Sequence, residues 1–158
     1  MNEIRQETVR TTPSMRARSL SRHQLRILVA DDDEVIAYLV AELLASMGHH
    51  VCAVETTVPG VVQGALRERP DLMIVDARLA DGNGPSAVAG VQRHLQIPHF
   101  YISGGIVSEV GSAIVLQKPF READLGSAIA RTLEMVSDVE KRRPDGKCAR
   151  SLVTRRSP

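Results

Sequence analysis

Cysteines and long apolar runs are both scarce in this sequence of 158 residues. Its two cysteines, Cys52 and Cys148, lie in a predicted strand and in a polar tail. Neither has a metal-ligating neighbour at a suitable spacing, so we interpret both as free thiols. No apolar stretch approaches the roughly 18 residues that a membrane-spanning helix needs. The opening residues, MNEIRQETVR, carry charge where a secretory signal is apolar. These absences argue against membrane insertion and export, and they predict a cytoplasmic protein.

Net charge is also small, at +1, but the charge is unevenly distributed along the chain. Both ends are basic, whereas the acidic clusters lie in the middle, and segments as polar as these ends bury too little apolar surface to fold. We therefore predict a disordered basic extension at residues 1–24, a folded domain at 25–140 and a flexible basic tail at 141–158. Basic ends can bind nucleic acid or anionic lipid. The tail is too short for a separate DNA-binding domain, so we expect no sequence-specific DNA binding.

The middle of the chain alternates between short apolar runs and helical patterns. RILVAD is a β-branched run, and apolar residues then recur at helical spacing until Gly48, a typical helix end. Nearly all-apolar strands that alternate with helices indicate an α/β fold, a doubly wound parallel sheet of five strands covered on both faces. The predicted strands are residues 26–31, 50–55, 71–76, 99–103 and 113–117, and the predicted helices are residues 34–48, 58–69, 84–96 and 121–136.

Polar side chains stand where several of the predicted strands end. The first strand ends at Asp31 and Asp32, the third at Asp76, the fourth at Ser103 and the fifth at Lys118. Each residue alone has an ordinary explanation as a turn or helix-cap residue. The carboxyl ends of parallel strands share one edge of the sheet, however, and ligands bind there in doubly wound folds. The presence of all these residues at one edge therefore predicts a ligand-binding site there.

The residue types at this edge suit phosphoryl chemistry. Clustered carboxylates repel one another unless a cation, a proton or solvent relieves them, and Mg²⁺ prefers oxygen ligands and often completes its shell with a phosphate. A lysine supplies positive charge to a phosphoryl oxygen, a hydroxyl can donate a hydrogen bond to it, and an aspartate can itself be the nucleophile. The set suffices for a Mg²⁺-dependent aspartyl-phosphate site. Asp76 is the best acceptor because it stands alone at its strand end.

These motifs resemble the receiver domain of two-component response regulators over residues 25–137. ILVADDDEVI is similar to that family's opening strand and acidic pair, DLMIVDARLADGNG to its phosphoacceptor strand, and QKPF to its Lys-Pro segment. The resemblance implies a flavodoxin-like sheet with strand order 2-1-3-4-5. It also implies phosphorylation of Asp76, contact of the phosphoryl group with Ser103 and Lys118, and a cis bond before Pro119.

The resemblance further implies a bound ion and a set of partners. Asp32, Asp76 and the backbone carbonyl of Arg78 would bind Mg²⁺ directly, and Asp31 would act through water. The phosphoryl donor would be a sensor histidine kinase or a phosphotransfer protein. An unknown downstream protein would meet a surface formed by the fourth strand, its following loop, the fifth strand and the last helix.

The connection from Ser103 to Lys118 departs from the family pattern. It is several residues shorter than in most receivers, and Gly104 and Gly105 loosen its backbone further. We therefore predict a shortened or mobile fourth helix. Val115 stands three positions before the lysine, where the family usually has an aromatic switch residue. PHFYISGG resembles a diverged form of a single-domain receiver class whose fourth strand reads Pro-Phe-x-Phe-Ala-Thr-Gly-Gly/Tyr.

Three functions stay open from the sequence alone. The first is a stand-alone receiver, a phosphorylation switch that assists its own phosphorylation and dephosphorylation but is otherwise no enzyme. The second is a degenerate receiver that acts as a constitutive binding module, against which the complete acidic, hydroxyl and lysine set argues. The third is an aspartyl-nucleophile phosphohydrolase of the haloacid dehalogenase type. DDDEV lacks the hydroxyl of that class's first-strand motif, so this reading is the least favoured.

The histidines give no sign of a metal site. His49 and His50 fall in a predicted helix-to-strand turn and His94 on a helix surface, and none has a partner at ligand spacing. We expect these three side chains to be exposed. His99 begins the fourth strand, which places it at the opposite end of the sheet from the acidic residues.

Overall fold

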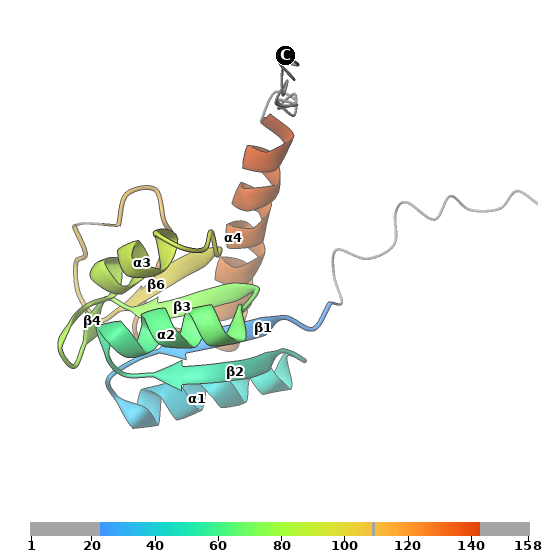
Figure 1. The fold of residues 1–158 in the computed structure, drawn as a ribbon. Helices are drawn as coiled ribbons and strands as arrows, with labels where there is room; N and C mark the ends of the chain where they lie inside the picture. The colour runs from blue at the N-terminus through green and yellow to red at the C-terminus, as the bar shows by residue number, and fades with distance from the viewer. Residues whose placement is uncertain (1–22, 109, 143–158) are drawn as a thin grey trace, which may run out of the picture.

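The computed structural model describes residues 23–108 and 110–142, which form one sheet with helices on both faces (Figure 1). The predicted extension at 1–24 and tail at 141–158 lie almost wholly outside the described residues, as does Cys148. The strands are β1 (Arg26–Ala30), β2 (His50–Glu55), β3 (Leu72–Asp76), β4 (Arg78–Leu79), β5 (Gly82–Asn83), β6 (His99–Ser103) and β7 (Val115–Gln117). The helices are α1 (Glu34–Ser46), α2 (Val58–Glu68), α3 (Gly84–Gln92) and α4 (Glu122–Arg142).

The main sheet has five parallel strands in the order β2-β1-β3-β6-β7. Numbered by their sequence among these five, the strands run 2-1-3-4-5, so the predicted doubly wound, flavodoxin-like topology is confirmed. β3 is central and all five of its residues are buried. Because the strands are parallel, the residues that follow β1, β3, β6 and β7 meet at one edge of the sheet.

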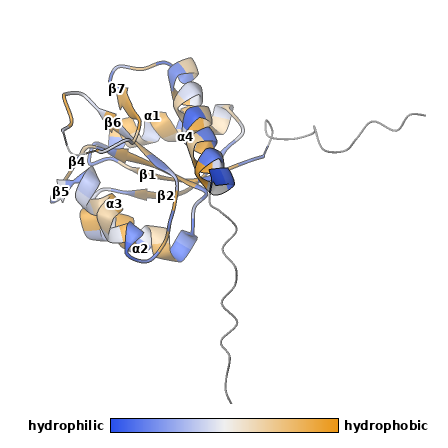
Figure 2. Cartoon of the chain, turned by 90° about the horizontal axis from the view of Figure 1, so that it is seen from above, coloured by the Kyte–Doolittle hydropathy of each residue, from blue (hydrophilic) through white to orange (hydrophobic). Residues whose placement is uncertain are grey.

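Each face of the sheet has its own apolar core. One cluster joins Ile27, Val29 and Ile74 of the sheet to residues of α1 and α4, and the other joins Leu28, Met73 and residues of α2 and α3. Alternate residues of β1 and β3 thus point to opposite faces, as the pleat requires. Figure 2 shows the hydrophobic strands enclosed between the helices. The burial of both faces explains why these strands lack a polar alternation in the sequence.

Side-chain caps fix where three of the helices begin. The Asp33 carboxylate accepts hydrogen bonds from the backbone N–H groups of Val35 and Ile36, at 2.9 and 3.3 Å. Thr57 caps α2 and Asn83 caps α3 in the same way, and each of these helices has a proline in its first turn. Such caps satisfy N–H groups that have no partner within the helix. The chain direction after β1, β2 and β5 is therefore set by short-range chemistry.

Two features differ from the expectations, and a third confirms one of them. β4 and β5 form a small antiparallel ladder between β3 and α3 that the sequence patterns did not predict. α4 continues to Arg142 rather than ending near residue 136, and its last turns project beyond the sheet (Figure 1). The predicted shortening of the fourth helix is confirmed in an extreme form, because the described residues between β6 and β7 contain bends and a turn but no helix.

Some smaller expectations are also settled by the structure. Cys52 is a free thiol, and burial raises its pKa. The expectation of an exposed His49 was wrong, because its ring is partly buried and its Nδ1 accepts a hydrogen bond from the backbone of Leu25. His50 and His94 are exposed as expected. Among the described helices, none is both long and apolar enough to cross a bilayer.

Candidate functional site

Four strands of the sheet deliver polar side chains to one edge. Asp31 follows β1, Asp76 ends β3, Ser103 ends β6 and Lys118 follows β7. Asp31, Asp76 and Ser103 are each less than 10% exposed, although residues of these types are mostly found on protein surfaces. The shared location predicted from the strand ends is therefore observed, and the buried charges there require partners.

Three carboxylates lie together at this edge. Asp31, Asp32 and Asp76 each offer one carboxylate oxygen, and these oxygens lie within 4.8 Å of one another. Asp32 is exposed whereas the other two are buried, so the cluster is open to solvent on the Asp32 side. Closely spaced oxygen donors with one open side suit a hard divalent cation that keeps some of its water, as Mg²⁺ does. The donor set of this chain thus fits the expected ion.

Lys118 neutralises the buried pair of carboxylates. Its Nζ lies 3.0 Å from Asp31 Oδ2 and 2.5 Å from Asp76 Oδ2. Burial alone would lower the pKa of this lysine, but the hydrogen bonds and charges of Asp76 and Asp31 outweigh burial and raise it. The ammonium is therefore charged at neutral pH and bridges the first and third strands of the fold. The peptide bond between Lys118 and Pro119 is cis, as the family resemblance implied.

The surroundings of Asp31 disfavour its charged form. Burial raises its pKa, and the neighbouring charge of Asp76 acts in the same direction. The backbone N–H of Asp33, 2.9 Å from Asp31 Oδ1, and the ammonium of Lys118 both act in the opposite direction. The net upward direction means that a further positive charge at this cluster would relieve a real electrostatic cost.

The backbone also shapes the position of Asp76. The N–H of Arg78 donates to Asp76 Oδ1 at 2.8 Å, which leaves Oδ2 to the lysine. Gly84 packs directly against this residue, because a Cβ atom at Gly84 would lie only 2.3 Å from the Asp76 carbonyl oxygen. This role of Gly84 was not among the features predicted from the sequence. Its sequence signal is a glycine between the α3 cap, Asn83, and the first-turn proline, Pro85.

Ser103 reaches the same edge but makes different contacts. Its hydroxyl donates to the Gly105 carbonyl at 2.9 Å and accepts from the Gly105 N–H at 3.1 Å. Its carbonyl accepts from the Lys118 N–H at 2.8 Å, which ties the end of β6 to the lysine segment. No hydrogen bond joins the hydroxyl to Asp76 or Lys118 among the described residues. Ser103 is thus adjacent to the acidic cluster and bonded to its own turn.

Comparison with known proteins identifies the family. The family model of the response regulator receiver domain matches residues 27–130, about two thirds of the chain. The chain belongs to the response regulator receiver family. The matched residues include the main sheet from the second residue of β1 onward and every predicted site residue. The resemblance stated from the acidic, phosphoacceptor and Lys-Pro motifs is therefore confirmed.

Two curated proteins resemble this receiver over most of its length. A protein-glutamate methylesterase/protein-glutamine glutaminase of Anaeromyxobacter dehalogenans is 30% identical over 65% of this chain and 32% of its own length. The phyllosphere-induced regulator PhyR of Methylorubrum extorquens is 28% identical over 73% of this chain and 46% of its own length. The receiver thus spans about a third to a half of these relatives. Their names describe the longer proteins.

Solved structures support the fold independently. PhyR of Bartonella quintana, described as an anti-anti-sigma factor, superimposes with a TM-score of 0.67 at 21% identity, over 76% of this chain and 51% of that one. The receiver domain of PhyR from Erythrobacter litoralis gives a TM-score of 0.61 at 23% identity, over 70% of this chain and 91% of that domain. At this level of identity, the likeness establishes the shared fold.

Proposed function

We propose that this receiver accepts a phosphoryl group on Asp76 in a Mg²⁺-dependent reaction and thereby switches a protein-interaction surface. The observation that carries the proposal is the single ammonium of Lys118 hydrogen-bonded to both Asp31 and Asp76 beside a third carboxylate. This arrangement holds a nucleophile, a positive charge for phosphoryl oxygens and oxygen ligands for a cation at one edge. Phosphoryl transfer needs little more than such positioning and charge neutralisation.

Asp32, Asp76 and the Arg78 carbonyl are the proposed direct ligands of Mg²⁺, and Asp31 is the proposed ligand through water. When bound, the ion would neutralise charge on the incoming phosphoryl oxygens. The three carboxylates lie close enough to share one ion. The raised pKa of Asp31 indicates an electrostatic cost that such an ion would relieve. The Arg78 carbonyl is part of this set by family resemblance.

In addition to the ion, the transfer step needs the groups of this chain and a phosphorylated donor histidine. An Asp76 carboxylate oxygen attacks phosphorus, an O–P bond forms, and the N–P bond of the donor breaks with the electron pair returning to its imidazole. The Asp76 oxygen that Lys118 now contacts is partly neutralised and oriented. After transfer, the same ammonium can pair with a phosphoryl oxygen in place of the free carboxylate. The proposed donor is a sensor histidine kinase or a phosphotransfer protein.

The switch is proposed to run through Ser103 and the helix-free connection after it. A phosphoryl group on Asp76 would offer oxygens to the Ser103 hydroxyl, which could then exchange its bonds to Gly105 for a bond to the phosphoryl group. The connection continues directly into β7 and Lys118, so both of its ends lie at the site. A downstream protein must bind the two states unequally for this change to act as a signal.

The downstream partner is proposed to be a protein rather than DNA, and the compartment to be the cytoplasm. The PhyR relatives include one described as an anti-anti-sigma factor. This receiver matches about half of that chain, so the same kind of partner is one candidate for it. We also propose that the receiver works without an output domain, on the likeness of PHFYISGG to a single-domain class.

An amide NMR titration with Mg²⁺ and then beryllofluoride, a phosphoryl mimic, tests the proposal. We expect Mg²⁺ to shift signals near Asp31, Asp32 and Asp76, and the mimic to shift residues 103–118 in the wild type but not in Asp76→Ala. Phosphoester turnover that is lost in Asp32→Ala would instead favour a hydrolase. No response to either ligand would contradict the proposal and leave a constitutive binding module.

A further inference from the structure

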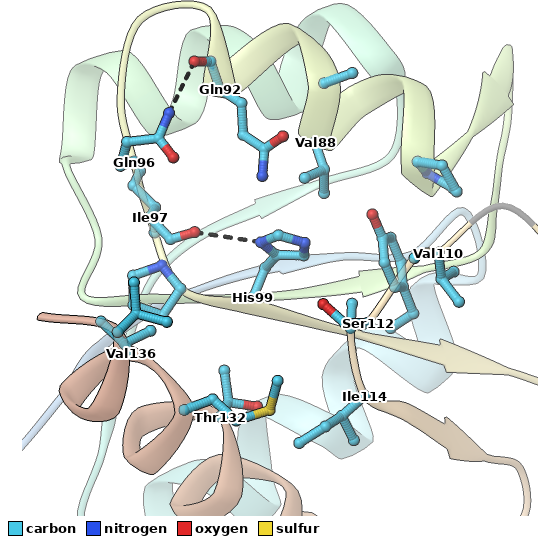
Figure 3. A pocket seen from close by; sticks show the side chains of 18 residues that line it. Val88, Gln92, Gln96, Ile97, His99, Val110, Ser112, Ile114, Thr132 and Val136 are labelled. Atoms are coloured by element: carbon cyan, nitrogen blue, oxygen red, sulfur yellow. Dashed lines mark hydrogen bonds between the residues drawn. The ribbon is translucent and has the colours of Figure 1, made fainter. Parts of the chain in front are cut away.

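A cavity separate from the acidic edge lies beside β6, between α3, α4 and the segment before β7 (Figure 3). Its volume is about 710 Å³, within the range of sites for small molecules, about 300–1,000 Å³. Figure 3 shows Val88 and Gln92 on α3, His99 on β6, Ser112 and Ile114 on the connecting segment, and Thr132 and Val136 on α4. No site residue of the proposed phosphoryl chemistry lines this cavity.

The cavity exists because the β6–β7 connection forms no helix in its described residues. A strand-to-strand crossover in a doubly wound sheet normally covers the sheet with a helix. Here residues 110–114 run beside the sheet with a turn but no helix. They line the cavity instead of filling it. The projecting turns of α4 supply the opposite wall through Met135, Val136 and Val139.

The described residues of the walls carry no formal charge. They are mostly apolar with a few polar groups, and neither Asp, Glu, Lys nor Arg is among them. The one titratable base among them, His99, donates through Nδ1 to the Ile97 carbonyl, 3.3 Å away, and burial lowers its pKa. The imidazole is therefore neutral at neutral pH. An ion would leave water for this cavity without a counter-charge, so the walls favour an uncharged occupant.

One hydroxyl in the walls has no hydrogen-bond partner among the described residues. Tyr101 is 3% exposed as a whole residue and lines the cavity. No enclosed side-chain oxygen or nitrogen in the described part of the chain lacks a partner, so the Tyr101 hydroxyl oxygen itself is not enclosed. The Thr132 hydroxyl differs, because it donates to the Ala128 carbonyl at 2.8 Å. Buried tyrosine hydroxyls usually find a partner.

The rings around this hydroxyl favour an aromatic occupant. The His99 and Tyr101 rings meet edge to face, with centroids 5.5 Å apart. They stand beside apolar side chains of α3 and α4, and the Gln92 side chain points toward His99 in Figure 3. Aromatic rings pair well in offset or edge-to-face arrangements, and an apolar body with one polar end suits walls of this composition.

We propose that this cavity binds a small, uncharged aromatic molecule that carries a hydroxyl or a similar hydrogen-bonding group, with the Tyr101 hydroxyl as its partner. The occupant is a free small molecule rather than a partner helix, because the described walls offer one hydroxyl without a partner among the described residues and no charged side chain. This site is independent of the phosphoryl chemistry proposed for Asp76.

Three probes of one shape separate the features of the proposal. The full chain would be titrated with 2-naphthol, with naphthalene and with the 2-naphthoate anion, and binding followed by amide NMR. We expect 2-naphthol to shift Gln92, His99, residues 110–114 and Thr132. We expect naphthalene to bind roughly fivefold more weakly, the loss of one net hydrogen bond, and 2-naphthoate to give no shifts there. Equal binding of 2-naphthol and 2-naphthoate, or shifts confined to other surfaces, would overturn the proposal.

Two variants and a control complete the test. Tyr101→Phe keeps the ring and should remove the preference for 2-naphthol over naphthalene. Ala89→Trp adds bulk at an exposed helix position that lines the cavity and should abolish the shifts. Arg93→Trp, at the exposed end of the same helix but outside the cavity lining, should bind 2-naphthol like the wild type. An unchanged probe preference in Tyr101→Phe, or unchanged binding in Ala89→Trp, would also overturn the proposal.

Discussion

The acidic edge and the neutral cavity are built in opposite ways around the same strand, β6. At the edge, strand ends bring three carboxylates and one ammonium together, and the buried charges of Asp31 and Asp76 are bonded to Lys118. Beside the cavity, none of the described lining residues is charged, and the Tyr101 hydroxyl has no hydrogen-bond partner among the described residues. The edge results from what the topology places together, and the cavity from the helix that the short connection does not form.

This contrast separates two kinds of constraint on the sequence. At the edge, the buried carboxylates need a charged partner, because unpaired buried charge is very unfavourable. At the cavity, the described lining residues are mostly apolar and uncharged. Perturbations at the edge should therefore change stability strongly, whereas perturbations at the cavity should act through single hydrogen bonds.

Gly84→Ala should give the largest effect. The new Cβ would lie 2.3 Å from the Asp76 carbonyl oxygen, a backbone atom that cannot turn away. We expect a loss of at least about 3 kcal/mol in unfolding free energy, the upper range for overpacking, measured by urea denaturation. Gly126→Ala is the matched control. Its Cβ would meet only the flexible end of Met47 at 3.3 Å, so its stability should stay near that of the wild type. Equal losses in both variants would contradict the close approach at Asp76.

Lys118→Met should give the second-largest loss of stability. It keeps much of the side-chain volume but leaves Asp31 and Asp76 without their shared cation. Because the lysine is partly open to solvent, we expect a loss of about 2 kcal/mol, below the range for fully buried pairs. Added Mg²⁺ should restore part of the stability. Lys141→Met, which breaks an exposed pair with Asp138, should change little. An undiminished loss in the presence of Mg²⁺ would contradict the shared cation site.

Tyr101→Phe should change stability at high pH. Burial raises the pKa of Tyr101 from its usual 10 to about 12. The neutral form is therefore favoured in the folded state, and its contribution is complete below about pH 10 and is lost as pH rises to about 12. Because the hydroxyl oxygen is not enclosed, we expect the unfolding free energy to fall by about 1–2 kcal/mol over this pH range, less than the whole pKa shift would give. Denaturation at pH 9 and 12 should show a smaller decline in Tyr101→Phe than in the wild type. Identical declines would contradict a buried hydroxyl.

Asp33→Ala should give the smallest of these effects and resolves the roles within the DDD triplet. Its carboxylate caps α1 through Val35 and Ile36, so its loss should lower stability by about 1 kcal/mol. The Asp33→Ala variant should bind Mg²⁺ with an affinity close to that of the wild type, because Asp33 is outside the carboxylate cluster. Asp32→Ala should behave in the opposite way, with weakened Mg²⁺ binding and little change in stability. Isothermal titration and urea denaturation on both variants check this, and weakened Mg²⁺ binding in Asp33→Ala would contradict the assignment.

Much of the fold could be predicted because its strands are apolar on both faces. The bounds predicted for residues 50–55 and 99–103 are those of β2 and β6. The carboxyl ends of parallel strands must meet, so the gathering of Asp31, Asp76, Ser103 and Lys118 at one edge also followed from the sequence. The β4–β5 ladder did not, because two-residue strands have no periodicity to detect.

Other features depend on contacts that a single sequence does not display. The role of Gly84 arises from a backbone 8 residues away in the chain, and the Ser103 bonds to Gly105 depend on the local turn. The departure at residues 103–118 was visible as a short connection, which predicted a reduced helix. The cavity that this reduction leaves was not visible, since its walls come from α3, β6 and α4 together.

Phosphorylation of the full chain by a small-molecule donor, followed by intact-mass spectrometry, tests the central claim most directly. The wild type and Asp76→Asn would be incubated with phosphoramidate, each with Mg²⁺ and with excess chelator. We predict that the wild type gains the mass of one phosphoryl group with Mg²⁺ only, and that Asp76→Asn gains none in either condition. Equal modification of Asp76→Asn, or no modification of a folded, Mg²⁺-binding wild type, would contradict Asp76 as the phosphoacceptor.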